Sequence, residues 1–432
     1  MQIREYVQKM KEISPAAASS PLSVRDASLR AISQALASHR EEIFQANRED
    51  LARAAADGIQ DFVMKRLRFD EHKLSDCLSG IESLLSLPDP VGRITLKRQL
   101  DEGLTLTRIS CPIGVIGIIF EARPDALVQI SCLCIKSGNC AVLKGGRETA
   151  STNKVLFTLI RDAALSAGMP DGFLLQVSEH SQVDELLCCD DCVDLLIPRG
   201  SNKFVRYIME HTKIPVMGHS EGICHIYVDD KADLKKAIPI ILDAKLQYTA
   251  ACNAVETLLV NRAVAPVFLP VLCAELREHG IRIRGVSEVL SYAGEDVSSD
   301  PSALMSGNDF RTEYLAPVVS VKIVDSVEEA AAHINRFGSH HTDAILTEDP
   351  QHAEAFMTLV DSAGVYQNCS TRFADGFRYG FGAEVGISTG KLHARGPVGL
   401  EGLVTYKYRL VGHGQIVGDY ASGNSQFHFK DL

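Results

Sequence analysis

The chain has 432 residues, of which 46% are hydrophobic and 23% are charged, and its formal net charge is −11. This length and composition predict a globular protein of two or three domains and exclude a largely disordered or fibrous one. The excess of acidic residues argues against a nucleic-acid-binding protein. No apolar run is long enough to cross a bilayer, and the N-terminal segment lacks the apolar core of a signal peptide. We therefore expect a cytoplasmic protein.

Twelve cysteines are spread along the chain. In a long cytoplasmic protein they are expected to stay reduced and to pack as small hydrophobic side chains. Cys188, Cys189 and Cys192 lie close together, but no second pair of ligands follows at a spacing suited to zinc. We expect no metal site, and ask instead whether one cysteine is a nucleophile.

The first hundred residues predict a helical layer. Between residues 22 and 56, apolar side chains recur at steps of three and four and are separated by charged faces. The alternation of apolar and polar residues at 104–111 then predicts an exposed strand.

The middle of the chain consists of short, nearly continuous apolar runs. They lie at residues 115–120, 141–143, 173–177 and 193–197, with a helical pattern at 152–167. Such runs are typical of parallel strands buried on both faces, so this part predicts a doubly wound α/β domain.

A second α/β segment follows residue 230. Helical patterns at 232–242 and 264–279 accompany predicted strands at 257–260, 318–324 and 344–347. A late alternating run at 403–410 predicts an antiparallel ribbon with the strand at 104–111, whose edge suits pairing with another subunit.

Cys252 is the first candidate for chemistry. It lies among small residues in YTAACNAVETLLV, which would let a substrate carbon approach the sulfur. If Cys252 began a helix, the helix N-terminus would lower the pKa of the thiol and hold a developing oxyanion. The alternative, for any one of twelve thiols, is a packed core cysteine.

Two further segments suit a nucleotide. In LIPRGSNKFVRYI, Gly200 and Ser201 join a buried strand to a helix, where backbone N–H groups bind an anion such as a pyrophosphate. In AVLKGGRET, Lys144 and Arg147 follow another strand, and two cations there suit a ribose that carries an extra phosphate, hence NADP. The alternatives are a tight turn and two solvated surface charges.

Five blocks of sequence together resemble the γ-glutamyl phosphate reductase family of the aldehyde dehydrogenase superfamily. The blocks are PIGVIGIIFEARPDALVQI (112–130), IKSGNCAVLKGGRE (135–148), RGSNKFV (199–205), DAKLQYTAACNAVETLLV (243–260) and HINRFGSHHTDAI (333–345). The resemblance covers essentially the whole chain, and the blocks follow the family's order. The resemblance implies NADPH-dependent reduction of L-glutamyl 5-phosphate to L-glutamate 5-semialdehyde with release of phosphate, the second step of proline biosynthesis from glutamate.

The same resemblance implies an aldehyde-dehydrogenase-like α/β fold. It has a doubly wound NADP-binding domain at 1–228, which includes the helical layer and the first ribbon strand, and an α/β catalytic domain at 229–400. A C-terminal strand and tail at 401–432 complete a β-ribbon used in oligomerisation. We expect a homodimer or a dimer of dimers and a functional link to a separate glutamate 5-kinase, without nucleic acid, membrane or metal.

The resemblance also assigns roles to single residues. Cys252 is the nucleophile that forms a thioester. Lys144 lies at the adenosine ribose, Gly200 and Ser201 at the pyrophosphate, and Glu313 at the nicotinamide ribose.

Four residues are assigned to the substrate: Arg123, Asn253, His341 and Asp343. Arg123 stands where oxidative aldehyde dehydrogenases have the Asn of a Trp-Asn-Phe-Pro segment, and binds either the substrate phosphate or the oxyanion. His341 and Asp343 lie in an HHTD segment whose alternative role is a structural turn. The water-activating glutamate of oxidative enzymes has only Glu221 nearby, in a shifted context, which fits a reductase that keeps water from its thioester.

Two other functions compete with this one. An oxidative aldehyde dehydrogenase acting on a small aldehyde is the alternative, and the departures at these Asn and Glu positions disfavour it. A non-catalytic scaffold that keeps the fold predicts loss of Cys252 or of the Lys144 region, and both are intact.

Overall fold

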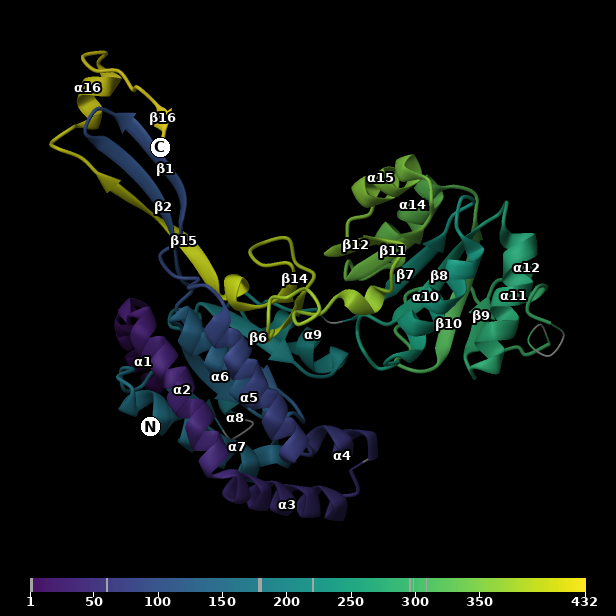
Figure 1. The fold of residues 1–432 in the computed structure, drawn as a ribbon, viewed down its shortest axis with the longest axis horizontal. Coiled ribbons are helices and arrows are strands. Elements are labelled where there is room, and N and C mark those ends of the chain that lie inside the picture. Colours follow the sequence, from purple (N-terminus) through teal and green to yellow (C-terminus); the bar gives the residue numbers. More distant parts are fainter. Residues whose placement is uncertain are drawn as a thin grey trace. The chain divides into compact units, whose positions relative to one another are not determined.

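A computed structural model describes residues 3–59, 61–177, 181–219, 221–294, 297, 299–307 and 309–432. The chain forms two compact units (Figure 1). Unit 1 comprises Met1–Met217, Gly380–Gly386 and Val398–Leu432, and unit 2 comprises Gly218–Tyr379 and Ile387–Pro397. Within the described part of the chain, no helix is both long enough and apolar enough to span a membrane.

Unit 1 begins with the predicted helical layer. The recurring apolar residues face inward: Leu29, Ile32, Leu36 and Ile43 are fully buried. Asp70 caps the last of these helices by accepting a hydrogen bond from the backbone of Lys73. The helices are α1 (Ile3–Ser19), α2 (Leu22–Ser38), α3 (Arg40–Ala56), α4 (Asp61–Leu67) and α5 (Glu71–Ser86).

The centre of unit 1 is a parallel sheet in the order β5-β4-β3-β6. Its strands are β3 (Val115–Phe120), β4 (Cys140–Lys144), β5 (Leu174–Val177) and β6 (Leu195–Arg199). The intervening helices are α6 (Pro124–Ser137), η1 (Arg147–Thr149), α7 (Ala150–Ser166) and α8 (Ser181–Leu187), and α9 (Asn202–His211) follows β6. Every residue of β3 is buried, which explains its unbroken apolar sequence and confirms the doubly wound prediction.

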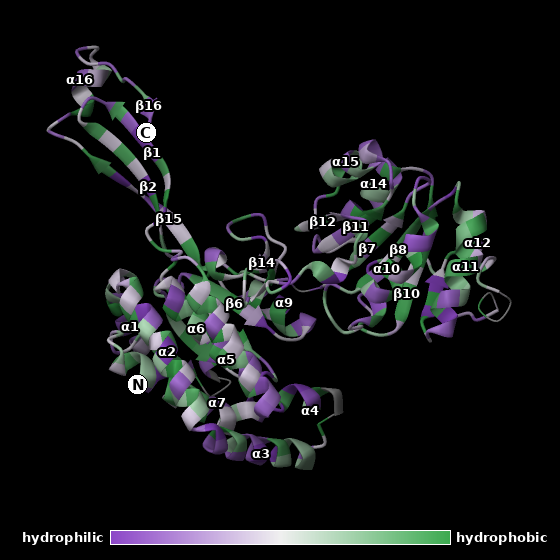
Figure 2. Ribbon diagram, in the orientation of Figure 1, coloured by the Kyte–Doolittle hydropathy of each residue, from purple (hydrophilic) through white to green (hydrophobic). Residues whose placement is uncertain are grey.

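The predicted ribbon also belongs to unit 1. Its order is β15-β2-β1-β16, and β15 runs antiparallel to β2 with Val404 opposite Pro112. Hydrophobic and hydrophilic residues follow one another along these strands (Figure 2). The elements are β1 (Ile94–Asp101), β2 (Leu104–Pro112), η3 (Leu400–Leu403), β15 (Val404–Val411), α16 (Val417–Ala421) and β16 (Lys430–Asp431). A separate two-stranded sheet consists of β13 (Gly386–Ser388) and β14 (Gly396–Val398).

Unit 2 contains a second parallel sheet, in the order β12-β11-β7-β8-β10-β9. Its strands are β7 (Cys224–Val228), β8 (Val255–Asn261), β9 (Arg282–Gly285), β10 (Val318–Val324), β11 (Thr342–Leu346) and β12 (Gly364–Gln367). Its helices are α10 (Leu234–Leu246), α11 (Ala265–Glu278), α12 (Ser287–Leu290), α14 (Val327–Phe337), α15 (Pro350–Leu359) and η2 (Thr371–Phe373).

Alternate residues of the unit 2 strands serve two separate cores. In β7, Ile226 and Val228 pack with residues of α10 and α11, whereas Tyr227 packs with residues of α14 and α15. Because helices cover both faces of the sheet, polar side chains that do not pack against a helix lie at the two ends of the strands. These ends hold the polar clusters described next.

Candidate active site

Cys252 lies in the turn that joins α10 to β8, three residues before the strand begins. The run after Cys252 is a strand, so the helix N-terminus considered from the sequence does not act on the thiol. Gly222 packs directly against this turn, and a Cβ atom there would lie 2.0 Å from the Cys252 carbonyl oxygen. A glycine at 222 therefore lets the two backbone segments approach.

Two imidazoles flank the Cys252 sulfur. His219 Nδ1 lies 2.8 Å from the carbonyl oxygen of Ile387, which fixes the orientation of the ring. His341 Nδ1 lies 3.0 Å from Thr342 Oγ1, and its buried Nε2 has no hydrogen-bond partner among the described residues. The sulfur and one nitrogen of each ring lie within 4.8 Å of one another.

These charges set the ionisation of the cysteine. Burial by itself raises the pKa of the Cys252 thiol, but His341 and His219 outweigh it and hold the pKa well below its ordinary value. Burial lowers the pKa of His219. The Cys252 thiolate raises it, as do the Ile387 carbonyl and Glu313 more weakly, and the result is a pKa of about 9. The site favours a thiolate beside an imidazolium.

The other thiols behave differently. All twelve cysteines are free, and among those with a shifted pKa only Cys252 is shifted downward. Burial raises the pKa of Cys189 to about 11, and it also raises that of Cys192. The described residues bring together two groups of three potential metal ligands, and the Cys188–Cys192 segment belongs to neither.

The structure separates two residues that the sequence assigned together. His341 precedes β11 and lies beside Cys252. Asp343 is fully buried within β11, where Oδ1 accepts a hydrogen bond from the His225 backbone at 2.7 Å and Oδ2 accepts one from the Ser362 hydroxyl at 2.5 Å. The carboxylate of Asp343 thus ties β11 to β7.

Asn253 connects the turn of Cys252 to η2. Its Nδ2 donates to the Ala374 carbonyl at 2.8 Å, and its backbone carbonyl accepts from the Thr371 hydroxyl at 2.7 Å. These bonds hold η2, which carries Arg372, against the turn of Cys252. The sequence assigned Asn253 to the substrate; in the structure its amide nitrogen holds a neighbouring loop.

A buried ion pair lies behind the site. Lys245 Nζ is 2.6 Å from Glu256 Oε2, and both side chains are fully buried. Burial raises the pKa of Glu256 to about 7 even though Lys245 opposes the shift. Glu313 acts electrostatically on Glu256, Lys245 and His219, so its carboxylate belongs to the same cluster of charges.

In unit 1, the predicted cofactor residues lie at the carboxyl ends of strands. Lys144 ends β4, is 7% exposed, and donates from Nζ to the Gly145 carbonyl at 2.6 Å. Burial lowers the pKa of Lys144, against the charges of Glu148 and Glu121. A cation is therefore held at the strand end where ligands of open α/β sheets bind.

At the start of α9 the sequence predicts a pyrophosphate site, and the structure places a carboxylate there. The backbone N–H of Ser201 donates to Glu121 Oε2 at 3.1 Å. A Cβ atom at Gly200 would lie 2.6 Å from the same oxygen, so glycine admits this close approach. The group bound at this position is a carboxylate of the chain itself.

A hollow of about 540 Å³ lies where α7 begins, and Arg147 is one of its exposed cations. Arg53 and Lys154 line it as well, together with the acidic Asp57 and Glu148, so three cations and two carboxylates surround the hollow. The buried Asp50 caps α7 by accepting hydrogen bonds from the backbone of Ser151 and Thr152. Arg123, the remaining sequence candidate in unit 1, is exposed at the start of α6.

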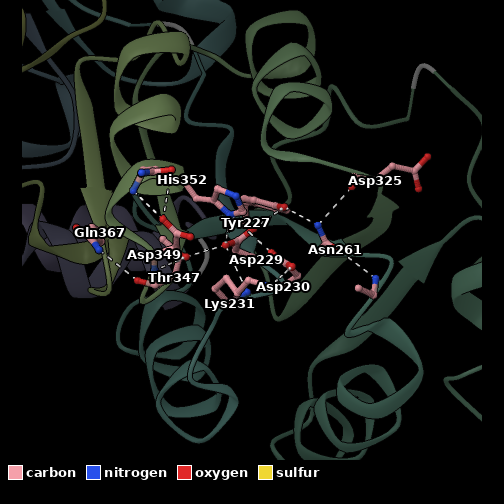
Figure 3. A network of polar contacts seen from close by, with 12 residues as sticks. Tyr227, Asp229, Asp230, Lys231, Asn261, Asp325, Thr347, Asp349, His352 and Gln367 are labelled. Carbon is pink, nitrogen blue, oxygen red and sulfur yellow. Dashed lines mark hydrogen bonds and ion pairs between the residues drawn. The ribbon is translucent and has the colours of Figure 1, made fainter.

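A second polar network occupies the carboxyl ends of the unit 2 strands, opposite the end of β8 that carries Cys252 (Figure 3). Asp229 is its centre: it accepts hydrogen bonds from Tyr227 at 3.0 Å and Thr347 at 2.7 Å and lies 2.8 Å from His352 Nδ1. Asn261 donates to Tyr227 at 2.9 Å. The network joins β7, β8 and β11.

Sequence reasoning missed His219 and Arg372. His219 lies in the MGHSEGIC segment, from which sequence reasoning named only Glu221. A histidine next to Ser220 and Glu221 is the feature of the sequence that could have indicated a site residue there. Arg372 follows Asn368, Cys369, Ser370 and Thr371, a polar turn after a strand, and such turns often carry ligand contacts.

A sequence model of the aldehyde dehydrogenase family matches residues 1–282. The γ-glutamyl phosphate reductase of Pelotomaculum thermopropionicum is 50% identical over 432 residues, covering 100% of this chain and 98% of the relative. The γ-glutamyl phosphate reductase 1 of Synechocystis is 52% identical over 409 residues, covering 94% of this chain and 93% of the relative. The crystal structure of the Thermotoga maritima γ-glutamyl phosphate reductase matches with a TM-score of 0.92 at 36% identity, covering 96% of this chain and all of that one. These similarities confirm the predicted fold class.

Proposed function

The chain belongs to the γ-glutamyl phosphate reductases of the aldehyde dehydrogenase family, and from that membership we propose that it reduces L-glutamyl 5-phosphate to L-glutamate 5-semialdehyde with NADPH and releases phosphate. The observation that carries this proposal is the Cys252 thiolate held beside His219 and His341. An acyl phosphate has a good leaving group and a thioester accepts hydride well, so a nucleophilic thiolate suits both halves of the reaction.

The chemistry follows from the two ionised groups. Cys252 Sγ attacks the acyl carbon, the bond from that carbon to the phosphate oxygen breaks, and a thioester remains. Loss of the thiolate charge removes the main interaction that raises the pKa of His219, so its imidazolium becomes a stronger acid. A bound nicotinamide coenzyme supplies the hydride that reduces the thioester. His219 gives its proton to the resulting hemithioacetal oxygen and takes it back as the carbon–sulfur bond breaks, which restores the thiolate.

The residues of unit 1 fit the coenzyme. Members of the aldehyde dehydrogenase family use nicotinamide coenzymes. Lys144 suits the ribose because it supplies a cation at a strand end. The turn at Gly200 and Ser201 suits the pyrophosphate, which would replace the Glu121 carboxylate as the acceptor of the Ser201 N–H. The hollow beside Arg147, lined by further cations, favours NADPH over NADH. We assign residues 1–228 to coenzyme binding, apart from the stretch that begins at Gly218, which carries His219 and belongs to the same compact unit as Cys252.

Residues 229–400 form the catalytic domain in this proposal. Glu313 binds the nicotinamide ribose, and its electrostatic influence on His219 supports this role. Among the substrate candidates, His341 and Asn253 lie next to Cys252, whereas Asp343 supports the strand that carries His341. Arg123 is assigned to the substrate phosphate or oxyanion.

We further propose a homodimer or dimer of dimers that uses the ribbon and the tail at 401–432. The support is the row of exposed apolar side chains on β15, where Tyr406, Tyr408 and Leu410 are each more than half exposed. Light scattering of the full chain at micromolar concentration tests this, and a monodisperse monomer would contradict it. The enzyme acts in the cytoplasm after a separate glutamate 5-kinase.

The reverse reaction tests the function. Glutamate 5-semialdehyde, NADP and phosphate are mixed and NADPH formation is followed, with and without phosphate. We expect strict dependence on phosphate and loss of turnover in Cys252→Ala. NADP reduction at full rate without phosphate would mean that water deacylates the thioester, and the chain would then be an oxidative aldehyde dehydrogenase. Equal kcat/KM for NADH and NADPH would contradict the role of Arg147.

A further inference from the structure

Arg372 is a buried cation with no ion-pair partner in contact among the described residues. It is 9% exposed, and no carboxylate of a described residue lies within 4.0 Å of its guanidinium. Its Nε donates to the neutral Gln247 Oε1 at 2.8 Å. Arginine is rarely buried unless it is paired, because leaving water costs its charge a large solvation energy.

A second arginine lies beside it. Arg378 donates from its guanidinium to the backbone carbonyl of Arg372, and no described carboxylate pairs with Arg378 either. Burial lowers the pKa of Arg372, and the charge of Arg378 adds to that shift. The charges of Cys252, Asp375 and Asp243 oppose it more weakly, and neither aspartate is in ion-pair contact with Arg372. Two neighbouring guanidinium groups repel each other, so an anion between or beside them would relieve both the repulsion and the missing partner.

The position of Arg372 ties it to the nucleophile. Its short helix, η2, is bonded on both sides to Asn253, the residue after Cys252: Thr371 donates to the Asn253 carbonyl, and Asn253 donates to Ala374. The charge of Cys252 also acts on Arg372 directly. The unpaired guanidinium therefore lies within electrostatic reach of the reacting sulfur.

We propose that Arg372, with Arg378 beside it, binds an oxyanion group of the substrate next to Cys252. The proposal rests on the function proposed above. L-Glutamyl 5-phosphate carries two such groups, the phosphate on the acyl carbon and the α-carboxylate at the other end of its carbon chain. Both are planar or forked acceptors that match the paired N–H groups of a guanidinium.

The steady-state test is the reverse reaction with Arg372→Gln and Arg372→Lys. Loss of a charge-assisted, bidentate contact weakens binding by about 10- to 100-fold. If Arg372 binds phosphate, KM for phosphate rises by this factor and KM for the semialdehyde changes little. If it binds the α-carboxylate, KM for the semialdehyde rises by this factor and KM for phosphate changes little. Arg372→Lys keeps the charge but not the fork, and we expect it to recover part of the loss.

The matched control is Arg262→Gln. Arg262 follows the carboxyl end of β8, whereas Cys252 precedes the amino end of the same strand, and it is paired on the surface with Glu288 and Asp325. We expect unchanged KM values for both substrates. A fall in kcat in Arg372→Gln with both KM values unchanged would indicate a structural role and would overturn the proposal.

A second measurement does not depend on turnover. Iodoacetamide alkylates Cys252, and mass spectrometry of its peptide reports the rate in the presence of inorganic phosphate or of glutamate. We expect one of these oxyanions to protect Cys252 in the wild type and not in Arg372→Gln, with the thermal unfolding of both proteins compared. If protection through Arg372 is found but no phosphate-dependent turnover, the anion site stands and the proposed reaction fails. If neither oxyanion protects the wild type, the anion site itself is refuted.

Discussion

His219 and Ile387 are 168 residues apart, yet His219 Nδ1 lies 2.8 Å from the Ile387 carbonyl oxygen. A carbonyl oxygen only accepts hydrogen bonds, so the contact requires a proton on Nδ1 and leaves the other nitrogen for Cys252. The same carbonyl helps to raise the pKa of His219. A backbone group far along the chain thus helps to prepare the nucleophile.

The first prediction concerns the ionisation of Cys252. At pH 6.5, a thiol with an ordinary pKa near 8.5 is only about 1% ionised, whereas Cys252 is expected to be a thiolate. Alkylation of Cys252 by iodoacetamide should therefore stay fast at pH 6.5 in the wild type. In His219→Gln it should slow by about 10- to 100-fold at this pH and recover near pH 9. A pH profile identical to that of the wild type would show that His219 does not stabilise the thiolate.

Zinc should inhibit the enzyme reversibly. Cys252, His219 and His341 offer one sulfur and two nitrogens within 4.8 Å of one another, the ligand types that Zn²⁺ prefers. We expect inhibition by added Zn²⁺, full recovery with EDTA, and at least about tenfold weaker inhibition in His341→Gln. EDTA alone should leave activity unchanged. Equal inhibition of the variant and the wild type would place the zinc elsewhere.

The pair formed by Lys245 and Glu256 should be sensitive to removal of one partner. Both side chains are fully buried, so Lys245→Met leaves the Glu256 carboxyl without its partner. We expect a loss of about 3–5 kcal/mol in the free energy of unfolding, measured with urea. The double variant Lys245→Met/Glu256→Leu should recover most of it, because no buried charge remains. A single variant as stable as the wild type would contradict this account.

His333 and His352 should make the free energy of unfolding depend on pH in opposite directions. Burial, followed by the charges of His225, Lys322 and Arg336, lowers the pKa of His333 to about 2. Because an unfolded histidine has a pKa near 6.5, the contribution of neutral His333 is complete above that pH and declines as pH falls. Through His333, the wild type should lose roughly 1–2 kcal/mol of its free energy of unfolding between pH 6.5 and 5, and His333→Leu should not show this part of the loss.

His352 is the matched control for that experiment. The hydrogen bond and charge of Asp229 raise its pKa (Figure 3), so its contribution is complete below pH of about 6.5 and is lost as pH rises through the folded-state value. His352→Gln should lose stability at pH 5.5 and much less at pH 9, as measured by thermal unfolding. Parallel pH profiles for the His333 and His352 variants would refute both assignments.

The sequence alone determined the α/β architecture and indicated Cys252 as the candidate nucleophile. The run at 115–120 has no polar side chain and the run at 193–197 has one, Asp194; such runs are typical of strands covered on both faces, so they predict parallel strands under helices. The small neighbours of Cys252 leave a packed core cysteine open, and the resemblance of five sequence blocks to a known family is what indicates a nucleophile. Neither inference needs knowledge of contacts between distant residues.

Only the tertiary structure decided which groups surround Cys252. Whether the next residues form a helix or a strand was open, because a short apolar run suits both, and pairing with β7 and β10 settled it as β8. His219 and His341 come from segments that precede the amino ends of β7 and β11, and Arg372 comes from the loop after β12, which is bonded to Asn253. Parallel strands bring the segments before their amino ends to one edge of a sheet, whatever their separation along the chain. The low pKa of Cys252 depends on that meeting of charges rather than on its neighbours in sequence.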